Sequence, residues 1–208
     1  MSVLDAKRAR PLEGGPTYPL RHRLFRLCWD VTWFLLAAWT PPPLRGWRRF
    51  LLRLFGAKVA PTAIIYGDAR IWYPPNLEMK DHSMLARRTF AYTADRITIG
   101  EYAVVSMGAF LCTASHDIED PYFQTIVRPI TIGQRAWIAA EAFLGPGVNV
   151  GEGAVLGARG CAFRNLEAWT VYAGNPAREL KGRKLRVLEE EAGKVDWPGP
   201  SASSPGVS

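Results

Sequence analysis

Histidine and cysteine, which build many metal sites and all disulfide frameworks, are scarce in this sequence. Its 208 residues include three histidines and three cysteines. Cys28, Cys112 and Cys161 are scattered and odd in number, without the paired spacing of a zinc finger. Such a set is typical of a reducing compartment and argues against a disulfide-stabilised scaffold.

The sequence also lacks a hydrophobic segment long enough to cross a membrane. The most apolar N-terminal stretch, between Arg21 and Trp39, contains Arg26 and Asp30 and is shorter than the about 20 residues that a span needs. The polar residues before it have neither an apolar core nor a cleavage-like site, so no secretory signal is expected. We therefore predict a cytoplasmic protein.

Acidic residues are few at the N-terminal end and balanced elsewhere. Residues 1–58 contain eleven lysines and arginines against three acids, a net charge of +8, whereas the remainder has fifteen against sixteen, or −1. A nucleic-acid-binding protein normally carries basic groups across a folded face, with aromatics on which bases stack. The body of the chain has no such excess, so no nucleic acid partner is expected.

A six-residue repeat dominates the second half of the chain. An aliphatic or small apolar residue returns at every sixth position, and the next position is small in all but the last case. The repeated residues are Ile132, Ile138, Leu144, Val150, Leu156 and Ala162. This period fits neither a helix nor an alternating strand. It predicts a β-solenoid, in which stacked coils of three hexapeptides bury a continuous core.

The same period extends backwards in three shifted frames, which begin at Val59, Met79 and Ile99. One interruption, residues 112–131, is long enough to leave the solenoid as a loop, and it contains His116. Loops on a rigid scaffold commonly carry chemistry. This loop is therefore the first candidate for an active site.

We predict a solenoid domain of residues 57–177 with further segments before and after it. Residues 1–20 are polar with several prolines and glycines, and we expect them to be flexible. Residues 21–56 show helical spacing of apolar groups and predict two helices. Residues 178–191 are charged and predict a short C-terminal helix, and residues 192–208 have the composition of a disordered tail.

Two interpretations of the N-terminal helices remain open. They can cap the open end of the solenoid, which terminal coils require. Alternatively, residues 21–55 can lie as an amphipathic anchor on the inner face of the membrane, since they carry four of the eight tryptophans. The second helix has a charged side made of Arg45, Arg48, Arg49 and Arg53. Both interpretations can hold at once.

Several segments resemble the hexapeptide-repeat acyltransferases, in the branch of the galactoside, maltose and nodulation-factor O-acetyltransferases. These segments are residues 130–138 (ITIGQRAWI), 146–151 (PGVNVG), 155–158 (VLGA) and 173–178 (AGNPAR). Others are similar to the colanic acid biosynthesis acetyltransferases: residues 55–58 (FGAK), 70–74 (RIWYP), 105–117 (VSMGAFLCTASHD) and 120–123 (DPYF). The resemblance covers about residues 20–185.

The resemblance implies a left-handed parallel β-helix, an obligate homotrimer and acetyl-CoA bound in a groove between neighbouring subunits. By position, His116 matches the catalytic base of the family. The positions implied for acetyl-CoA are Trp137 at a corner beside the groove, Ala140 and Ala158 along the pantetheine arm, and Arg164, Arg178 and Lys181 near the nucleotide phosphates. Thr93 stands where close relatives carry an asparagine near the acceptor.

The implied chemistry suits a histidine. A sugar hydroxyl is a poor nucleophile at neutral pH, and a general base that takes its proton typically contributes 10² to 10⁴ in rate. Asp117 either orients His116 or caps the turn, and both roles stay open. His22 and His82 have no chemistry-bearing neighbours in the sequence, and Cys112 and Cys161 fall where small buried residues fit.

The sequence therefore predicts an acetyl-CoA-dependent O-acetyltransferase acting on a sugar or glycan, in exopolysaccharide or surface-glycan biosynthesis. The acceptor can be free or lipid-linked. The alternatives are an N-acyltransferase acting on an amino sugar and a non-catalytic β-helix scaffold. A metal enzyme like the γ-class carbonic anhydrases needs a three-histidine site. With only His116 in the loop, no metal is expected.

Overall fold

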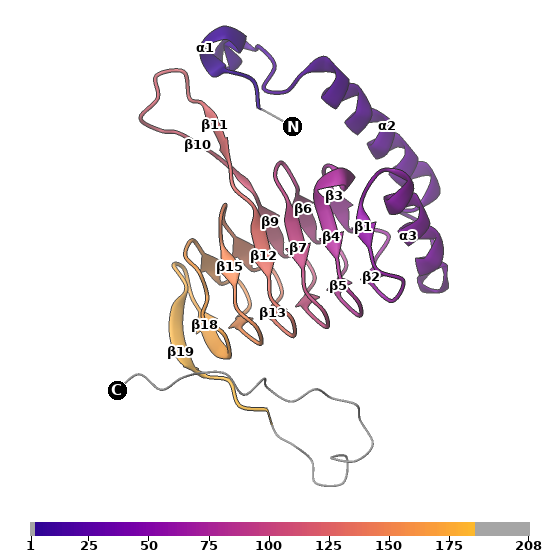
Figure 1. Cartoon of the computed structure of the whole chain (residues 1–208), viewed down its shortest axis with the longest axis vertical. Coiled ribbons are helices and arrows are strands. Elements are labelled where there is room, and N and C mark those ends of the chain that lie inside the picture. The colour runs from indigo at the N-terminus through magenta and orange to yellow at the C-terminus, as the bar shows by residue number, and fades with distance from the viewer. Residues whose placement is uncertain (1–2, 186–208) are drawn as a thin grey trace.

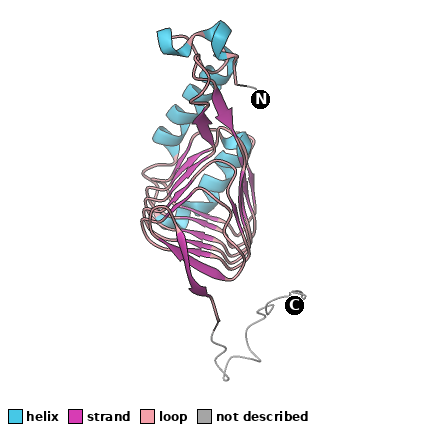
Figure 2. Ribbon diagram, turned by 90° about the vertical axis from the view of Figure 1, so that its left-hand side faces the viewer, coloured by secondary structure: helices cyan, strands magenta, loops and turns pink. Residues whose placement is uncertain are grey.

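A computed structural model describes residues 3–185 of the chain, and its main body is a parallel β-helix (Figure 1). Helices α2 (Leu20–Leu36) and α3 (Arg45–Leu54) lie along one end of the solenoid. A hairpin projects from its middle toward the short helix α1 (Ala6–Ala9). Figure 2 shows the same arrangement from the side, with the strands stacked in flat layers.

Three sheets form the faces of the solenoid. Sheet A contains β1 (Lys58–Val59), β4 (Leu77–Met79), β7 (Ile97–Ile99), β12 (Ile130–Ile132) and β15 (Asn149–Val150). Sheet B contains β2 (Ile64–Ile65), β5 (Met84–Leu85), β8 (Val104–Val105), β13 (Trp137–Ile138), β16 (Val155–Leu156), β18 (Thr170–Ala173) and β19 (Arg178–Gly182). Sheet C contains β3 (Arg70–Ile71), β6 (Phe90–Tyr92), β9 (Phe110–Cys112), β14 (Phe143–Leu144) and β17 (Cys161–Ala162).

The interior is filled by the residues that the six-residue period identifies. The six repeated residues of the late coils are all at most 3% exposed. Parallel pairing sets Ile132 beside Val150 and Ile138 beside Leu156, so equivalent residues stack eighteen positions apart. The residues of the three earlier frames are buried in the same core: Val59, Ile65, Ile71, Leu77, Met79, Leu85, Ala91, Ile97, Ile99, Val105 and Leu111. The predicted solenoid is confirmed.

The small residue after each aliphatic one is needed for close stacking of coils. A Cβ added at Gly133 would lie 2.8 Å from the backbone nitrogen of Glu152 in the next coil. The backbone instead turns two residues later, where Arg135 has a φ of 56°. Each corner therefore uses two positions. The first must be small so that the coils can stack, and the second has a left-handed backbone conformation that makes the turn.

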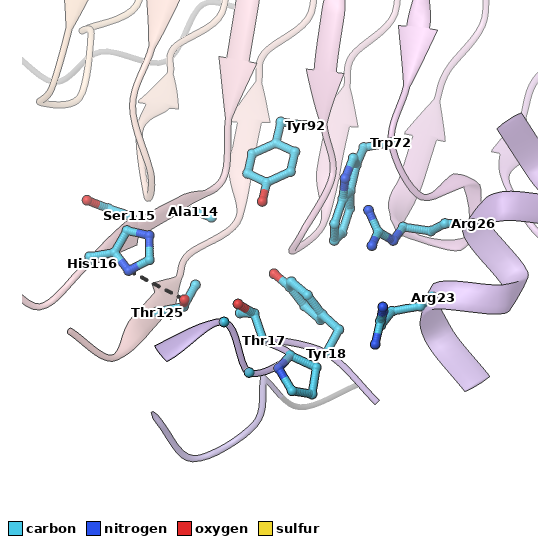
Figure 3. Close-up of a pocket in the computed structure, with 13 residues that line it drawn as sticks. Thr17, Tyr18, Arg23, Arg26, Trp72, Tyr92, Ala114, Ser115, His116 and Thr125 are labelled. Carbon is cyan, nitrogen blue, oxygen red and sulfur yellow. Dashed lines mark hydrogen bonds between the residues drawn. The ribbon is translucent and has the colours of Figure 1, made fainter. Parts of the chain in front are cut away.

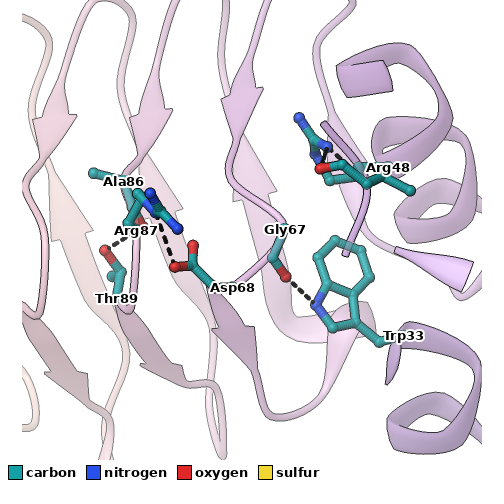
Figure 4. Close-up of polar contacts among 8 residues, drawn as sticks. Trp33, Arg48, Gly67, Asp68, Ala86, Arg87 and Thr89 are labelled. Carbon is teal, nitrogen blue, oxygen red and sulfur yellow. Dashed lines mark hydrogen bonds and ion pairs between the residues drawn. The ribbon is translucent and has the colours of Figure 1, made fainter. Parts of the chain in front are cut away.

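The N-terminal helices cap a row of backbone acceptors. Ile64 donates its N–H to Ser83 O at 2.8 Å, and Tyr66 donates to Leu85 O at 3.1 Å, so these residues pair with the second coil and the residues that alternate with them present their carbonyls to the open end. Five of these carbonyls accept from cap side chains: Ile71 from Trp29, Gly67 from Trp33, Ile65 from Arg48, Ala63 from Arg49 and Val59 from Arg53. Figure 4 shows the bond from Trp33 to the Gly67 carbonyl. Arginine and tryptophan side chains only donate, so they match this row.

This cap changes the interpretation of the arginines in α3. Arg48 is 3% exposed, and it also donates to the carbonyls of Thr40 and Pro41. Arg49 and Arg53 face the solenoid in the same way. Three of the four arginines predicted to form a charged outer side therefore hold the cap, and Arg45 remains exposed.

The first residues form an arm that docks on the hairpin rather than a fully irregular segment. Residues 6–9 are helical, and Pro11–Glu13 forms a 3₁₀ turn. Gln124 of the hairpin accepts from Ala6 N at 2.7 Å and donates to Leu4 O at 3.2 Å. Two further 3₁₀ turns lie at Pro42–Leu44 and Pro74–Asn76.

The C-terminal segment differs from the prediction. Residues 178–182 form strand β19, antiparallel to β18, where a helix was predicted. Charged composition favours a helix, but pairing with β18 provides backbone partners for an extended segment. The predicted helical residues after 185 and the predicted tail lie outside the described residues.

Candidate active site

A two-stranded hairpin presents His116 beside the solenoid. Strands β10 (Ala114–His116) and β11 (Thr125–Val127) pair antiparallel, with His116 opposite Thr125. The predicted loop 112–131 is therefore largely an ordered hairpin. It leaves the solenoid between β9 of sheet C and β12 of sheet A (Figure 1).

The imidazole of His116 is oriented by Phe123. The two rings stack with centroids 4.3 Å apart and planes 10° apart, and Nδ1 lies 3.0 Å from the Phe123 carbonyl oxygen. A carbonyl oxygen only accepts, so Nδ1 carries the hydrogen of this bond, and in the neutral imidazole the lone pair is then on Nε2. Thr125 Oγ1 lies 3.5 Å from Nδ1 and adds only a weak contact. The tautomer is the one that a general base acting through Nε2 requires.

Asp120 holds the turn that positions Phe123. Its carboxylate accepts from Tyr122 N at 2.9 Å and Gln124 N at 3.2 Å, while Phe123 N donates to the Asp120 carbonyl at 2.8 Å. Phe123 itself has a φ of 55°, in the left-handed region that disfavours bulky residues. Three hydrogen bonds around Asp120 therefore hold a strained residue that in turn orients His116.

The Asp117 side chain makes a different contact. Its Oδ1 accepts from Glu119 N at 3.0 Å, which is the local turn-capping interaction of an aspartate. Nδ1 of His116 is bonded to Phe123 instead. Of the two roles left open for Asp117, the geometry matches the turn cap.

A pocket of about 440 Å³ adjoins His116 (Figure 3). It lies between the hairpin, the N-terminal arm, helix α2 and the edge of the coils. The hairpin contributes Ala114, Ser115, His116 and Thr125, and the arm contributes Gly14, Gly15, Pro16, Thr17 and Tyr18. Helix α2 contributes Arg23 and Arg26, strand β6 contributes Tyr92, and Trp72 comes from the residue that follows β3. Sequence reasoning found only His116 among these residues, because the walls come from distant parts of the chain.

Aromatic rings form much of the pocket wall. Trp72 lies edge-on to Tyr18 and to Tyr92, with centroids 5.1 and 4.8 Å apart. The hydroxyls of Tyr18 and Tyr92 point toward each other (Figure 3). Burial, followed by the neighbouring Tyr92, raises the pKa of Tyr18, so this hydroxyl stays protonated at neutral pH. Flat apolar faces beside neutral hydroxyls suit the mixed surface of a sugar ring.

The residues predicted for acetyl-CoA lie on other faces of the same chain. Trp137 is on sheet B, exposed, and donates from Nε1 to Ser106 Oγ at 2.9 Å. Ala140 and Ala158 occupy stacked corners, where the Ala140 carbonyl accepts from Arg159 N at 2.9 Å. None of these residues lines the His116 pocket. A single chain therefore does not bring the two predicted halves of the site together.

The predicted basic residues gather at the last coils. Arg164 and Arg178 are exposed and line a groove of about 340 Å³, together with Phe163 and Glu179. Lys181 is exposed on β19, opposite Val171. The structure thus brings Arg164 and Arg178 to one groove and leaves Lys181 on the adjoining strand.

The other histidines and cysteines have structural surroundings. His22 is 3% exposed and stacks on Tyr18 at 4.8 Å, and burial, followed by the charge of Arg26, lowers its pKa to about 4. His82 stacks on Tyr102 at a corner. Burial raises the pKa of Cys112, which keeps it a thiol and a poor nucleophile.

Thr93, which stands where relatives carry an asparagine, links two coils. Its Oγ1 donates to Tyr73 O at 2.9 Å and accepts from Tyr73 N at 2.8 Å, and the residue is buried.

Within residues 3–185, no cluster of three or more metal-ligating side chains occurs, and no helix is both long and apolar enough to span a bilayer.

Comparison with known proteins identifies the family. No protein-family model matches the chain. It is 40% identical over 155 residues to “Putative colanic acid biosynthesis acetyltransferase WcaF” of Escherichia coli K12, which covers 74% of this chain and 85% of that protein. A chloramphenicol acetyltransferase of Escherichia coli is 28% identical over 131 residues, or 50% of this chain and 61% of the relative.

Solved structures share the fold. A maltose O-acetyltransferase of Clostridium difficile superposes with a TM-score of 0.74 at 21% identity, over 88% of this chain and all of the other. A hexapeptide-repeat acetyltransferase of Vibrio cholerae, solved with acetyl-CoA, gives 0.70 at 21% identity, over 87% and 100%. The solenoid is the left-handed parallel β-helix of these enzymes. With its hexapeptide coils and its similarity to WcaF, the chain belongs to the hexapeptide-repeat acetyltransferases.

Proposed function

We propose that the protein transfers an acetyl group from acetyl-CoA to a sugar hydroxyl, with His116 as the general base. The observation that carries the proposal is the bond from Nδ1 to the Phe123 carbonyl, which leaves the Nε2 lone pair of a pocket-lining histidine free. Nε2 then takes the proton of the acceptor hydroxyl as its oxygen attacks the acetyl carbonyl. The thiol of coenzyme A is the leaving group, and general-base help of this kind is worth about 10² to 10⁴ in rate.

The late coils offer surroundings suited to acetyl-CoA. Arg164 and Arg178 line one groove, and Lys181 lies on the adjoining strand, so three cations are available for the nucleotide phosphates. Exposed Trp137 provides a wall for the pantetheine arm, and the corners at half-buried Ala140 and exposed Ala158 provide its backbone contacts.

We propose that these two halves meet across the interface of a homotrimer. In one chain the His116 hairpin leaves at the corner between sheets C and A, whereas Trp137 belongs to sheet B. A second copy, packed against the hairpin side, would supply its late coils to His116. Catalysis would then require the assembled trimer.

The test uses the full chain with acetyl-CoA and a panel of neutral glycosides. His116→Ala and His116→Gln should lower transfer at least about 100-fold while the trimer and the dissociation constant for acetyl-CoA stay unchanged. Transfer is followed by mass spectrometry of the glycoside and by release of free thiol, with trimer mass measured by light scattering. Near wild-type turnover in either variant would remove His116 from the mechanism.

The same panel separates the alternatives. Amino sugars with and without free hydroxyls distinguish O- from N-acylation, a relevant comparison because a structural neighbour is an N-acyltransferase solved with an amino-sugar nucleotide (TM-score 0.55). A scaffold would give no turnover with any acceptor. In cells, loss of the gene should remove one acetyl group from a surface polysaccharide.

We also propose that the protein works at the inner membrane surface. The face of α2 turned away from the solenoid is apolar, and Phe34 and the following Trp39 are each 72% exposed. Exposed Leu24, Leu27, Val31 and Leu35 continue this face. Because three arginines of α3 are engaged in the cap, insertion of apolar side chains should contribute more than charge.

Vesicle sedimentation tests this location without disturbing the cap. The Leu27→Ser/Phe34→Ser variant should lose binding to anionic vesicles, whereas Leu180→Ser, which removes an exposed leucine from β19, should bind as the wild type does. If the wild-type trimer stays in the supernatant at low salt, the helices serve as a cap only.

A further inference from the structure

The pocket beside His116 carries positive charge that its own walls do not neutralise. Arg23 and Arg26 line it, and no aspartate or glutamate does. Among the described residues 3–185, neither arginine is within salt-bridge distance of a carboxylate. An unneutralised pair of guanidinium groups in a concave site is suited to an anionic ligand.

Arg26 is held in place with donor capacity unused. Its guanidinium carbon lies 4.1 Å from the centre of the Trp72 ring, so the flat face packs against the indole. The buried Nε makes no hydrogen bond. A buried donor without an acceptor is costly, and an oxyanion would remove that cost.

Asp30, one turn further along α2, is not within salt-bridge distance of Arg26. Burial raises the pKa of Asp30 and outweighs the attraction of Arg26 and Arg70. Asp30 lines a neighbouring hollow, which Arg26 also lines, and it does not line the His116 pocket. Within the His116 pocket itself, no carboxylate lies beside Arg26.

The positions of the groups divide the pocket into two parts. The arginines lie on one side and His116 on the other, with Trp72, Tyr92 and Tyr18 between them (Figure 3). A volume of about 440 Å³ lies within the range usual for small-molecule sites. A sugar ring between the aromatic groups would turn a hydroxyl to His116 and its anionic substituent to the arginines.

We propose that the acceptor is a sugar that carries a phosphate, bound in this pocket with the phosphate on Arg23 and Arg26. The proposal rests on the sugar-directed transfer proposed above and narrows the acceptor to glycosyl phosphates. A free sugar phosphate, a nucleotide sugar and a lipid-linked sugar diphosphate all share this chemistry. The N-terminal arm is then part of the acceptor site, since residues 14–18 line the same pocket.

Binding to the intact trimer is measured by calorimetry, with a hexose 1-phosphate and the matched methyl hexoside as probes. The phosphate ester should bind at least about ten-fold more tightly, as expected for charge-assisted hydrogen bonds. Arg23→Gln should abolish that difference and leave methyl hexoside and acetyl-CoA binding unchanged. Arg21→Gln is the matched control, because Arg21 is exposed on the same helix and does not line the pocket.

Arg26→Lys provides a second variant that keeps the charge but loses the planar fork. It should weaken the hexose 1-phosphate without affecting the methyl hexoside, and a melting curve shows whether packing on Trp72 is kept. The proposal is overturned if both probes bind equally to the wild type, or if Arg23→Gln and Arg21→Gln weaken the phosphate ester alike.

Turnover with three acceptors then identifies the source of the phosphate and keeps the two proposals apart. Hexose 1-phosphate, a uridine diphosphate hexose and a polyprenyl diphosphate hexose in micelles are compared by kcat/KM, and preference for any of them over the methyl hexoside supports the inference. If transfer depends on His116 but kcat/KM is the same with and without the phosphate, the inference is overturned and the O-acetyltransferase proposal stays intact. Arg23-dependent binding without transfer would support the pocket and count against the proposed reaction.

Discussion

The imidazole of His116 lies parallel to the ring of Phe123 at 4.3 Å and donates from Nδ1 to the carbonyl oxygen of that same residue. One residue thus fixes both the plane of the base and its tautomer. Many catalytic histidines receive this help from a carboxylate. A neutral carbonyl leaves no negative charge to stabilise the imidazolium that forms during transfer, so the geometry contributes orientation rather than electrostatic assistance.

Asp120 should therefore matter for turnover although its side chain contacts only backbone of the hairpin. We expect Asp120→Ala to lower kcat by about ten- to 100-fold, because a small misplacement of a base is costly. KM for acetyl-CoA should stay unchanged, and Asp120→Asn should recover part of the rate by accepting one of the two backbone bonds.

Asp117→Asn is the matched control, three residues away in the same hairpin. A hydrogen bond that caps an exposed turn contributes little to the stability of the hairpin, so kcat should stay within about a factor of two of the wild-type value. The assignment of Asp120 and Asp117 would be reversed if the Asp117 variant lost turnover and the Asp120 variant kept it. Steady-state kinetics on both proteins decides between them.

Arg178 should contribute to acetyl-CoA binding through its place in the groove of the last coils. Arg178→Glu should raise KM for acetyl-CoA about ten-fold, because it replaces a phosphate-binding cation with a repelling charge. Lys184→Glu changes the net charge equally and lies outside the groove, and we expect little effect. A change in the acceptor KM alone would show that the groove serves the sugar instead.

His22 should make stability fall in mildly acidic solution. Its pKa is about 4 in the folded chain and near 6.5 when unfolded, so the folded state binds fewer protons in the range between these values. The neutral form is fully compatible with folding above about pH 6.5, and stability decreases as pH falls toward 4. His22→Phe keeps an aromatic ring and removes the titration. Between pH 7.5 and 5, its melting temperature should therefore fall less than that of the wild type; an equal fall would assign the acid sensitivity to other groups.

Arg48 should be the most stabilising arginine of the cap. Arg48→Met leaves the carbonyls of Ile65, Thr40 and Pro41 without this donor, at a cost of about 3 kcal/mol or more. For a chain of this size that corresponds to a fall in Tm of roughly 6–12 °C. Arg45→Met, on the exposed side of the same helix, should change Tm by no more than about 1–2 °C. Calorimetry of both variants gives the comparison, and equal values would mean that the Arg48 bonds add nothing net.

The solenoid could be predicted because its interior residues recur at every sixth position of the sequence. Each of the residues from Val59 to Ala162 in the four frames points inward, and the frame shifts mark corners and the hairpin. His116 could be found because histidine is rare and the loop interrupts an otherwise regular pattern. Residues 178–182 were predicted wrongly as helix because local charge composition does not reveal that β18 offers an unpaired edge.

The pocket could not be predicted, because its walls meet only in the folded chain. Tyr18, Arg23 and Thr125 have no shared spacing, and the arm reaches the hairpin through a contact between Ala6 and Gln124. The role of Phe123 depends on a left-handed backbone angle that its residue type does not suggest. The segment 120–123 (DPYF) did predict a turn, because an aspartate followed by a proline favours one. It did not indicate that this turn would contact the imidazole of His116.

The direction of the coils also has a consequence for self-association. Alternate residues of each strand in the first coil turn their N–H and C=O groups outward, so an uncovered solenoid would present unpaired backbone donors and acceptors at its ends. Two such ends are complementary, and identical molecules could add head to tail into a growing fibre. The arginine and tryptophan donors of α2 and α3 occupy the acceptor row in advance. The cap therefore sets an end to a periodic structure that has no intrinsic length of its own.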